Sequence, residues 1–111
     1  MASSFTHIIA FKYKPEATAE AIQEFEETFL GLETNCRKPD GTQYLTVRGG
    51  KQICTHPPAH GMQSVFIVEF ANKEDEKYFH DHDQAHAAFI PKAQGISTDA
   101  VILDFCPFQQ S

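Results

Sequence analysis

The sequence predicts an α+β fold of the ferredoxin-like, split βαβ type. Two observations lead to this prediction: strand-like and helix-like segments alternate along the chain, and their order is strand, helix, strand, strand, helix, strand. A chain of 111 residues is long enough for one domain with a real core. We therefore expect a single domain over 1–111, with its core in 5–105 and a loose tail over 107–111.

The first segment, 5–13, has the period of two that is typical of a strand. One of its faces is apolar and aromatic apart from a single histidine. The residues of this face are Phe5, His7, Ile9, Phe11 and Tyr13. From periodicity alone, a core or edge histidine bonded to backbone is the simpler interpretation of His7. If a pocket is built on this face, His7 becomes a functional group in it.

A long amphipathic helix is predicted over 18–34, with Thr18 as its N-cap. Its apolar stripe consists of Ile22, Phe25, Phe29 and Leu32. This stripe would face the sheet while the glutamates of the helix face water. Phe25 and Phe29 are core residues by default, and either could also form one wall of a pocket. Gly31 weakens the last turn.

The middle of the chain holds two strand segments separated by a loop. The first is predicted over 44–47, extending to 53, with a bulge or bend at Gly49-Gly50. The segment 55–61, THPPAHG, is a loop because its prolines lack an N–H donor and fix the backbone. The second strand is predicted over 62–70, which is rich in branched and aromatic residues.

Two short helices are predicted next. Asn72 caps the first, which runs through Tyr78 and breaks within 81–83. Asp83 is well placed to cap the second, in which His86 is the third residue. Pro91 and the glycine at 95 are expected to close this second helix.

The final strand is predicted over 99–105. Together with the first and third strands, it would give the sheet an apolar second face. The residues assigned to this face are Ile8, Ala10, Val65, Ile67, Ala100 and Ile102. Because the helices cover only one side of such a sheet, a second copy of the chain is the economical cover for the other side. The pattern therefore predicts a homodimer.

Composition argues against several classes of partner. The net charge is −6, so we expect neither a nucleic-acid surface nor a surface for anionic membranes. No apolar run approaches the length of a membrane span, and no signal-peptide pattern opens the chain. The three cysteines have no paired spacing, which is typical of free thiols in a reducing compartment. A cytoplasmic location is expected on this basis.

The stretch 78–89, YFHDHDQAHAAF, contains three of the six histidines beside an apolar segment. Groups that titrate near neutral pH beside an apolar wall suit general acid–base chemistry. His82 and His86 are four residues apart and Asp83 is nearby, so on one continuous helix they could share a metal ion. Asp83 is expected to interrupt that helix, however, and spacing identifies no third ligand. We therefore expect neither a metal nor a cofactor.

Three motifs resemble those of the stress-responsive A/B barrel (Dabb) family. Residues 7–15, HIIAFKYKP, followed by an acidic amphipathic helix, resemble the opening of these domains. Residues 83–89, DQAHAAF, resemble the second signature of the family, and 101–105, VILDF, resemble its terminal strand. The motifs occur in the right order, and the resemblance spans residues 5–105. It implies a dimeric α+β barrel.

The resemblance also implies an activity. Family members of the olivetolic acid cyclase type close a linear polyketide by aldol chemistry, using a histidine in the second signature and a tyrosine six residues earlier. That histidine matches His86 here. The position six residues earlier is His80, and the nearest phenol belongs to Tyr78. The first-strand histidine of these cyclases matches His7.

On this basis we expect a small-molecule enzyme of secondary metabolism, a cofactor-independent polyketide cyclase with His86 as general base. Tyr78 or His80 would stabilise the enolate, with His7 as a companion. The ligand, small and apolar or polyketide-like, would contact apolar side chains of both layers. These are Ile9, Phe11, Phe25, Phe29, Phe66 and Phe89. The alternative is a non-catalytic, stress-responsive or ligand-binding dimeric barrel.

Overall fold

A computed structural model of the protein describes residues 4–108. The elements in chain order are β1 (Phe5–Tyr13), α1 (Ala19–Leu30), α2 (Leu32–Asn35), β2 (Leu45–Lys51), the short 3-10 helix η1 (Pro57–Ala59), β3 (Ser64–Phe70), α3 (Lys73–Asp81), α4 (Gln84–Ile96) and β4 (Ser97–Phe105). Within this described part, four strands form one antiparallel sheet in the order β2-β3-β1-β4. The predicted ferredoxin-like α+β fold is confirmed.

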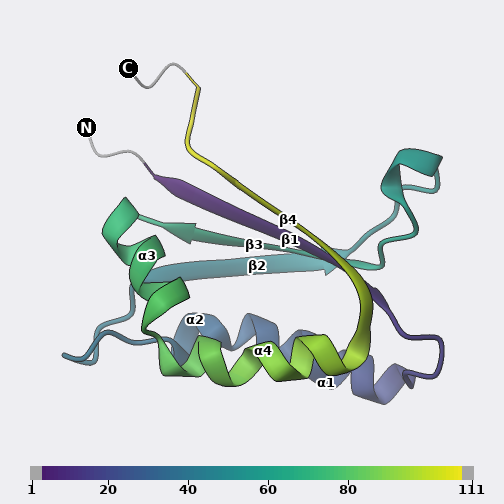
Figure 1. Ribbon diagram of the computed structural model, residues 1–111, viewed down its shortest axis with the longest axis horizontal. Helices are drawn as coiled ribbons and strands as arrows, with labels where there is room; N and C mark the ends of the chain where they lie inside the picture. The colour runs from purple at the N-terminus through teal and green to yellow at the C-terminus, as the bar shows by residue number, and fades with distance from the viewer. Residues whose placement is uncertain (1–3, 109–111) are drawn as a thin grey trace.

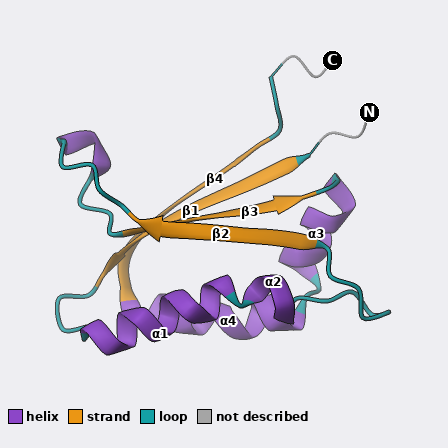
Figure 2. Ribbon diagram, turned by 180° about the vertical axis from the view of Figure 1, so that it is seen from behind, coloured by secondary structure: helices purple, strands orange, loops and turns teal. Residues whose placement is uncertain are grey.

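The helices lie on one side of the sheet. In both views α1, α2 and α4 run together beneath it, and α3 stands at one end (Figure 1, Figure 2). Aromatic rings occupy much of the space between the layers. Phe11 of β1 meets Phe25 and Phe29 of α1 edge-on, and Phe29 stacks on Phe66 of β3 with 4.0 Å between ring centroids. The aromatic stripe of the first helix is therefore part of the core.

The predicted helix over 18–34 is present in two parts. Thr18 caps α1 as expected, because its hydroxyl oxygen accepts a hydrogen bond from the backbone N–H of Ala21 at 3.1 Å. The chain interrupts the helix at Gly31 and then continues as the single turn α2. The weak position identified in the sequence is thus the place where the helix divides.

The helix α4 was predicted to close at Pro91 and Gly95; it continues through Pro91 and ends at Ile96, one residue after Gly95. Proline cannot donate a backbone hydrogen bond inside a helix, which costs stability. Phe89 of this helix is buried against the core, which favours the helix despite the missing donor, and the Ser97 hydroxyl donates to the Ala93 carbonyl at its C-terminal end. As a result β4 begins at residue 97, before the predicted 99.

The bulge predicted in β2 is absent from the described strand. The register with β3 is continuous from Leu45–Phe70 to Lys51–Ser64. Gly49 serves a different purpose, because a Cβ atom at this position would lie 2.5 Å from Cδ1 of Phe66. The glycine lets the Phe66 ring pack directly against the β2 backbone.

The assignment of Ala100 and Ile102 to the open face of the sheet is wrong. Ile102 lies opposite Ile9 and Ala100 lies opposite Phe11, and directly opposed residues of antiparallel strands project to the same side. Both residues therefore face the helices, because a difference of one residue in register exchanges the two faces. The apolar residues of the open face are Ile8, Ala10, Val65, Ile67, Val101, Leu103 and Phe105.

No helix within residues 4–108 is both long enough and apolar enough to cross a membrane. The loose tail predicted over 107–111 falls mostly outside the described residues, of which the last is Phe108.

A substitution of Gly49 tests the close packing of β2 on Phe66. Gly49→Ala should lower the free energy of unfolding by about 1–3 kcal/mol, because the new methyl group overlaps the Phe66 ring. Gly50→Ala is the matched control, since a Cβ there meets no atom within 4 Å. Urea unfolding of both variants measures the difference. Equal stability of the two variants would show that the Phe66 ring and the Val65 carbonyl oxygen, 2.7 Å from that Cβ, move aside without cost.

Candidate functional site

A cavity of about 310 Å³ lies between the helix-facing side of β1 and β4 and the helices. Its walls are mostly apolar, and three histidines gather along it. Four of the six apolar residues predicted to contact a ligand line this cavity, namely Ile9, Phe11, Phe29 and Phe89. The other two, Phe25 and Phe66, stack on Phe89 and Phe29 and support the wall from behind.

The histidines come from three different elements. His7 projects from the helix-facing side of β1, His80 lies in the last turn of α3, and His86 is the third residue of α4. The chain turns between α3 and α4, which brings the rings of His80 and His86 to 5.6 Å between centroids. The rings of His7 and His80 are 5.2 Å apart. His7 thus meets His80 and His86, which are distant from it in the sequence, at one cavity.

His86 is held as a neutral base. Its Nδ1 lies 3.1 Å from the backbone carbonyl of Phe79, which can only accept, so Nδ1 carries the proton and Nε2 has the free lone pair. Its ring also stacks on that of Phe79 with 3.9 Å between centroids. Burial, with the neighbouring His80 as a second cause, lowers the pKa of His86 to about 4. The ring is therefore uncharged at neutral pH.

His7 and His80 are each paired with a carboxylate. Nδ1 of His7 lies 2.6 Å from Oδ1 of Asp104 on β4, and Nδ1 of His80 lies 2.8 Å from Oε2 of Glu76, one turn earlier on α3. A carboxylate at this distance accepts the Nδ1 hydrogen and fixes the orientation of the ring. The Nε2 atom of each ring is then left for another partner.

The free nitrogens of His7 and His86 reach open space. Neither Nε2 has a hydrogen-bond partner among the described residues, whereas every fully buried side-chain nitrogen and oxygen in that part of the chain has one. The cavity is a space that both rings line. The side chain of His80 is 33% exposed. A base and two further imidazoles beside an apolar volume can transfer a proton to and from a small apolar ligand.

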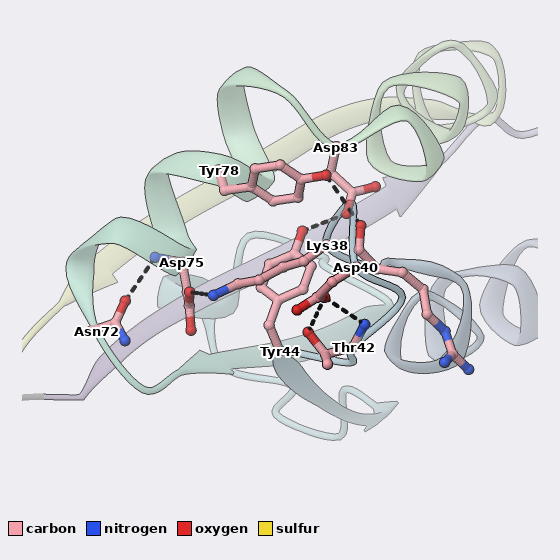
Figure 3. A network of polar contacts seen from close by, with 9 residues as sticks. Lys38, Asp40, Thr42, Tyr44, Asn72, Asp75, Tyr78 and Asp83 are labelled. Atoms are coloured by element: carbon pink, nitrogen blue, oxygen red, sulfur yellow. Dashed lines mark hydrogen bonds and ion pairs between the residues drawn. The ribbon is translucent and has the colours of Figure 1, made fainter.

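Tyr78 lies outside this cavity. Residues two apart on a helix point in directions roughly 160° apart, so His80 and Tyr78 cannot both face β1. The Tyr78 hydroxyl donates to the backbone carbonyl of Arg37 at 3.1 Å, and its ring meets that of Tyr44 at 5.3 Å (Figure 3). The structure therefore brings together His7, His80 and His86 and leaves the predicted phenol on the other side of α3.

Behind His86 lies the buried carboxylate of Asp83, which was predicted to cap α4 but whose contact with Tyr44 the sequence did not reveal. Oδ1 of Asp83 accepts hydrogen bonds from the backbone N–H groups of Ala85 and His86, at 2.9 and 3.2 Å. Its Oδ2 accepts from the Tyr44 hydroxyl at 2.5 Å (Figure 3). Burial, with the Asp83 carboxylate as a further cause, raises the pKa of Tyr44 well above its ordinary value. The phenol therefore stays protonated and remains a donor.

Cys36 is also part of this buried region and is fully enclosed. Burial, followed by the nearby Asp83 carboxylate, raises the pKa of its thiol to about 12. A thiol with so high a pKa does not supply a thiolate nucleophile near neutral pH. Its surroundings identify it as a core residue.

The metal arrangement considered for His82, Asp83 and His86 is not formed. The backbone leaves the helix at His82, whose ring lies 6.1 Å from that of Tyr78, while His86 faces the cavity. Across residues 4–108, no group of three or more histidine, cysteine, aspartate or glutamate side chains is arranged to hold a metal ion.

Glu76 and Asp104 are site residues that sequence reasoning missed. Glu76 could have been found, because a carboxylate four residues before a histidine on one helix lies beside it. Asp104 could not, since its pairing with His7 spans 97 residues and depends on the register of β1 and β4.

Comparison with known proteins identifies the family and the fold. The model of the Stress Responsive A/B Barrel Domain family matches residues 5–107. No curated protein matches the chain. Among solved structures, a hydroxynitrile lyase from Passiflora edulis is 13% identical, with 100% of this chain and 99% of that chain covered and a TM-score of 0.81.

Two further structures are similar. A Dabb family protein with a ferredoxin-like fold from Mesorhizobium loti is 18% identical, with 96% of this chain and 98% of that chain covered and a TM-score of 0.73. A dimeric ferredoxin-like protein of unknown function from Thermobifida fusca is 15% identical, with 96% and 93% covered and a TM-score of 0.74. At these identities the likeness establishes the fold alone.

The environment of His86 predicts its titration. Its pKa is about 4 in the folded protein against 6.5 for an ordinary histidine. The unfolded chain therefore takes up this proton first, and the contribution of neutral His86 to stability is complete above pH 6.5 and decreases as the pH falls toward 4. Histidine ring NMR should show one ring still neutral at pH 5, and that signal should be missing from His86→Gln. A His86 signal that titrates near pH 6.5 would contradict the buried, neutral ring.

Proposed function

The chain belongs to the stress-responsive A/B barrel family, and we propose that it is a cofactor-independent enzyme that closes a linear, polyketide-like substrate by aldol chemistry, with His86 as the general base. The observation that supports this proposal is the His86 ring itself. Its Nδ1 is hydrogen-bonded to the Phe79 carbonyl, and its free Nε2 borders an apolar cavity. A small-molecule enzyme of secondary metabolism is the class that fits this chemistry.

The first step would be removal of a proton from carbon between two carbonyl groups. Such protons are acidic enough for an imidazole to remove them. The low pKa of His86 applies when no charged ligand group lies beside the ring. As the proton moves, negative charge develops on the substrate beside the new imidazolium, and this ion pair raises the basicity of the ring where water is scarce. His80 and His7 would hydrogen-bond the developing enolate oxygen.

The second step forms the ring. The enolate carbon attacks another carbonyl carbon of the same chain, one carbon–carbon bond forms, and the electron pair of that carbonyl moves to its oxygen. The resulting alkoxide then takes the proton from the His86 imidazolium, which regenerates the neutral base. No electrons are gained or lost overall, so neither an oxidant nor a reductant is required.

The hydroxynitrile lyase with this fold supports catalysis as such. Cleavage of a hydroxynitrile breaks a carbon–carbon bond at a carbon that bears oxygen and leaves a carbonyl group. An aldol closure forms such a bond by attack on a carbonyl group. Both reactions need a base. The alternative is a ligand-binding barrel without turnover. The observation that favours it is the position of Tyr78, whose hydroxyl is bonded to the Arg37 carbonyl and is directed away from the cavity.

Turnover of a linear polyketide thioester tests the role of His86. His86→Gln should reduce kcat by about 10²–10⁴-fold, the usual contribution of a general base. His82→Gln is the matched control, because His82 is exposed and does not line the cavity. Mass spectrometry of the cyclised product gives the rates, and circular dichroism checks the fold of both variants. Full turnover by His86→Gln would reject His86 as the base.

We also propose that the protein is a homodimer joined through the open face of the sheet. Three apolar side chains of β4 are exposed there, with 40% of Val101, 60% of Leu103 and 49% of Phe105 accessible. Apolar exposure on this scale is typical of an interaction surface. The similar protein from Thermobifida fusca is described as dimeric, which supports the same assembly here.

A charge placed on this face tests the dimer. Leu103→Arg should convert the protein to a monomer at micromolar concentration, because it would bury an unpaired guanidinium between two sheets. Leu30→Arg is the control: Leu30 is also exposed, at 42%, but lies on α1. Sedimentation velocity measures both masses. A monomeric wild-type protein at micromolar concentration would refute the dimer itself.

A further inference from the structure

We propose that the end of the cavity formed by His7, His80 and His86 is a subsite for an anionic oxygen, and that the natural ligand carries a carboxylate on an apolar chain. The inference rests on the proposed function in taking this cavity as the substrate site. It concerns the chemical class of the ligand, which can be measured by binding without any turnover.

The hydrogen-bond partners of the three rings determine which ring nitrogens carry a proton. Each Nδ1 already faces an acceptor: the Asp104 carboxylate, the Glu76 carboxylate or the Phe79 carbonyl. With one proton per ring, every Nε2 would therefore be a bare acceptor. A carbonyl or carboxylate oxygen is an acceptor as well and would find no donor at such a site. At least one ring must carry a second proton for the site to bind oxygen.

The surroundings of each ring decide which one can carry that proton. His86 faces a neutral carbonyl through Nδ1 and is stacked on the Phe79 ring, so a second proton on it has no carboxylate at hydrogen-bond distance. His7 and His80 each have a carboxylate that offsets the added charge. These two rings can therefore donate from Nε2, which leaves His86 as the base beside them.

The charged groups around His80 leave the Nε2–H donors closer to a bound anion than the carboxylates are. Glu76 approaches from the same helix, while His7 of β1 and His86 of α4 approach from the facing elements. Both carboxylates bind the rings at Nδ1, on the opposite edge from Nε2, and the side chain of Asp104 is 53% exposed and screened by water. An anionic oxygen at Nε2 is therefore closer to the N–H groups than to either carboxylate.

The remainder of the cavity determines the rest of the ligand. Apart from the histidines, its wall is formed by phenylalanine and aliphatic side chains together with the uncharged Gln94 and Ser97. No lysine, arginine, aspartate or glutamate lines it among the described residues. A charged group has favourable partners only at the histidine end, so the other end should hold a hydrocarbon chain.

Calorimetric titration with hexanoate and hexanamide, in buffer with EDTA at pH 6, tests the proposal. The two ligands have the same chain and differ in the charge of the head group. Wild-type protein should bind hexanoate at least tenfold more tightly, a difference of about 1.4 kcal/mol.

Two variants locate the preference. Of the two proposed donors, His80 lies within 5.2 Å of the His7 ring and 5.6 Å of the His86 ring, measured between centroids. His80→Gln removes this donor, and Glu76→Gln removes the carboxylate that offsets its charge, so both should reduce the preference to about threefold or less, under 1 kcal/mol. His82→Gln should keep the wild-type preference, because His82 lies outside the cavity. If His80→Gln does not fold, Glu76→Gln carries the test alone.

Several results would overturn the proposal. These are equal binding of the two ligands, no binding of either, a preference that survives both His80→Gln and Glu76→Gln, and hexanoate binding that appears only when zinc replaces EDTA, which would make the imidazoles metal ligands. The outcome is independent of the cyclase proposal. Selective binding without cyclisation would retain the subsite and reject the cyclase, and cyclisation without selectivity would do the reverse.

Discussion

The arrangement of the site depends on one buried carboxylate, that of Asp83. An ionised carboxylate away from water needs several donors, and Asp83 receives them from two parts of the fold. The first turn of α4 supplies the backbone N–H groups of Ala85 and His86, and the segment leading into β2 supplies the Tyr44 hydroxyl. The same contacts thus start the helix, attach it beside the sheet and fix the backbone of His86.

From this anchor follows a division of roles among three chemically identical side chains. His86 is enclosed and faces a backbone carbonyl, which keeps it neutral with its basic nitrogen free. His7 and His80 lie at the same cavity but face carboxylates. When neighbouring titratable groups have different surroundings, their pKa values differ, and one site can hold both a base and proton donors. The distinction comes from the partners at Nδ1 and not from the residue type.

Local signals in the sequence predicted most of the fold. Thr18, Asn72 and Asp83 were identified as helix caps, and each side chain accepts the expected backbone hydrogen bond. The predictions were wrong where contacts with residues far away in the sequence determine the structure. The faces of β4 follow from its register with β1, and the persistence of α4 past Pro91 follows from the packing of that helix. Local patterns contain neither kind of information, because both belong to contacts between elements far apart in the sequence.

The strand β4 connects the site to the surface proposed for assembly. Its residues alternate between two tasks: Asp104 and Ile102 face the cavity side, where Asp104 orients His7, while Leu103 and Phe105 project to the open face. Within residues 4–108, β4 is also an edge strand, paired only with β1. A second copy packed on Leu103 and Phe105 would hold this strand in place and with it the carboxylate that aligns His7. The surface proposed for assembly and the carboxylate that orients His7 therefore lie on opposite faces of one strand.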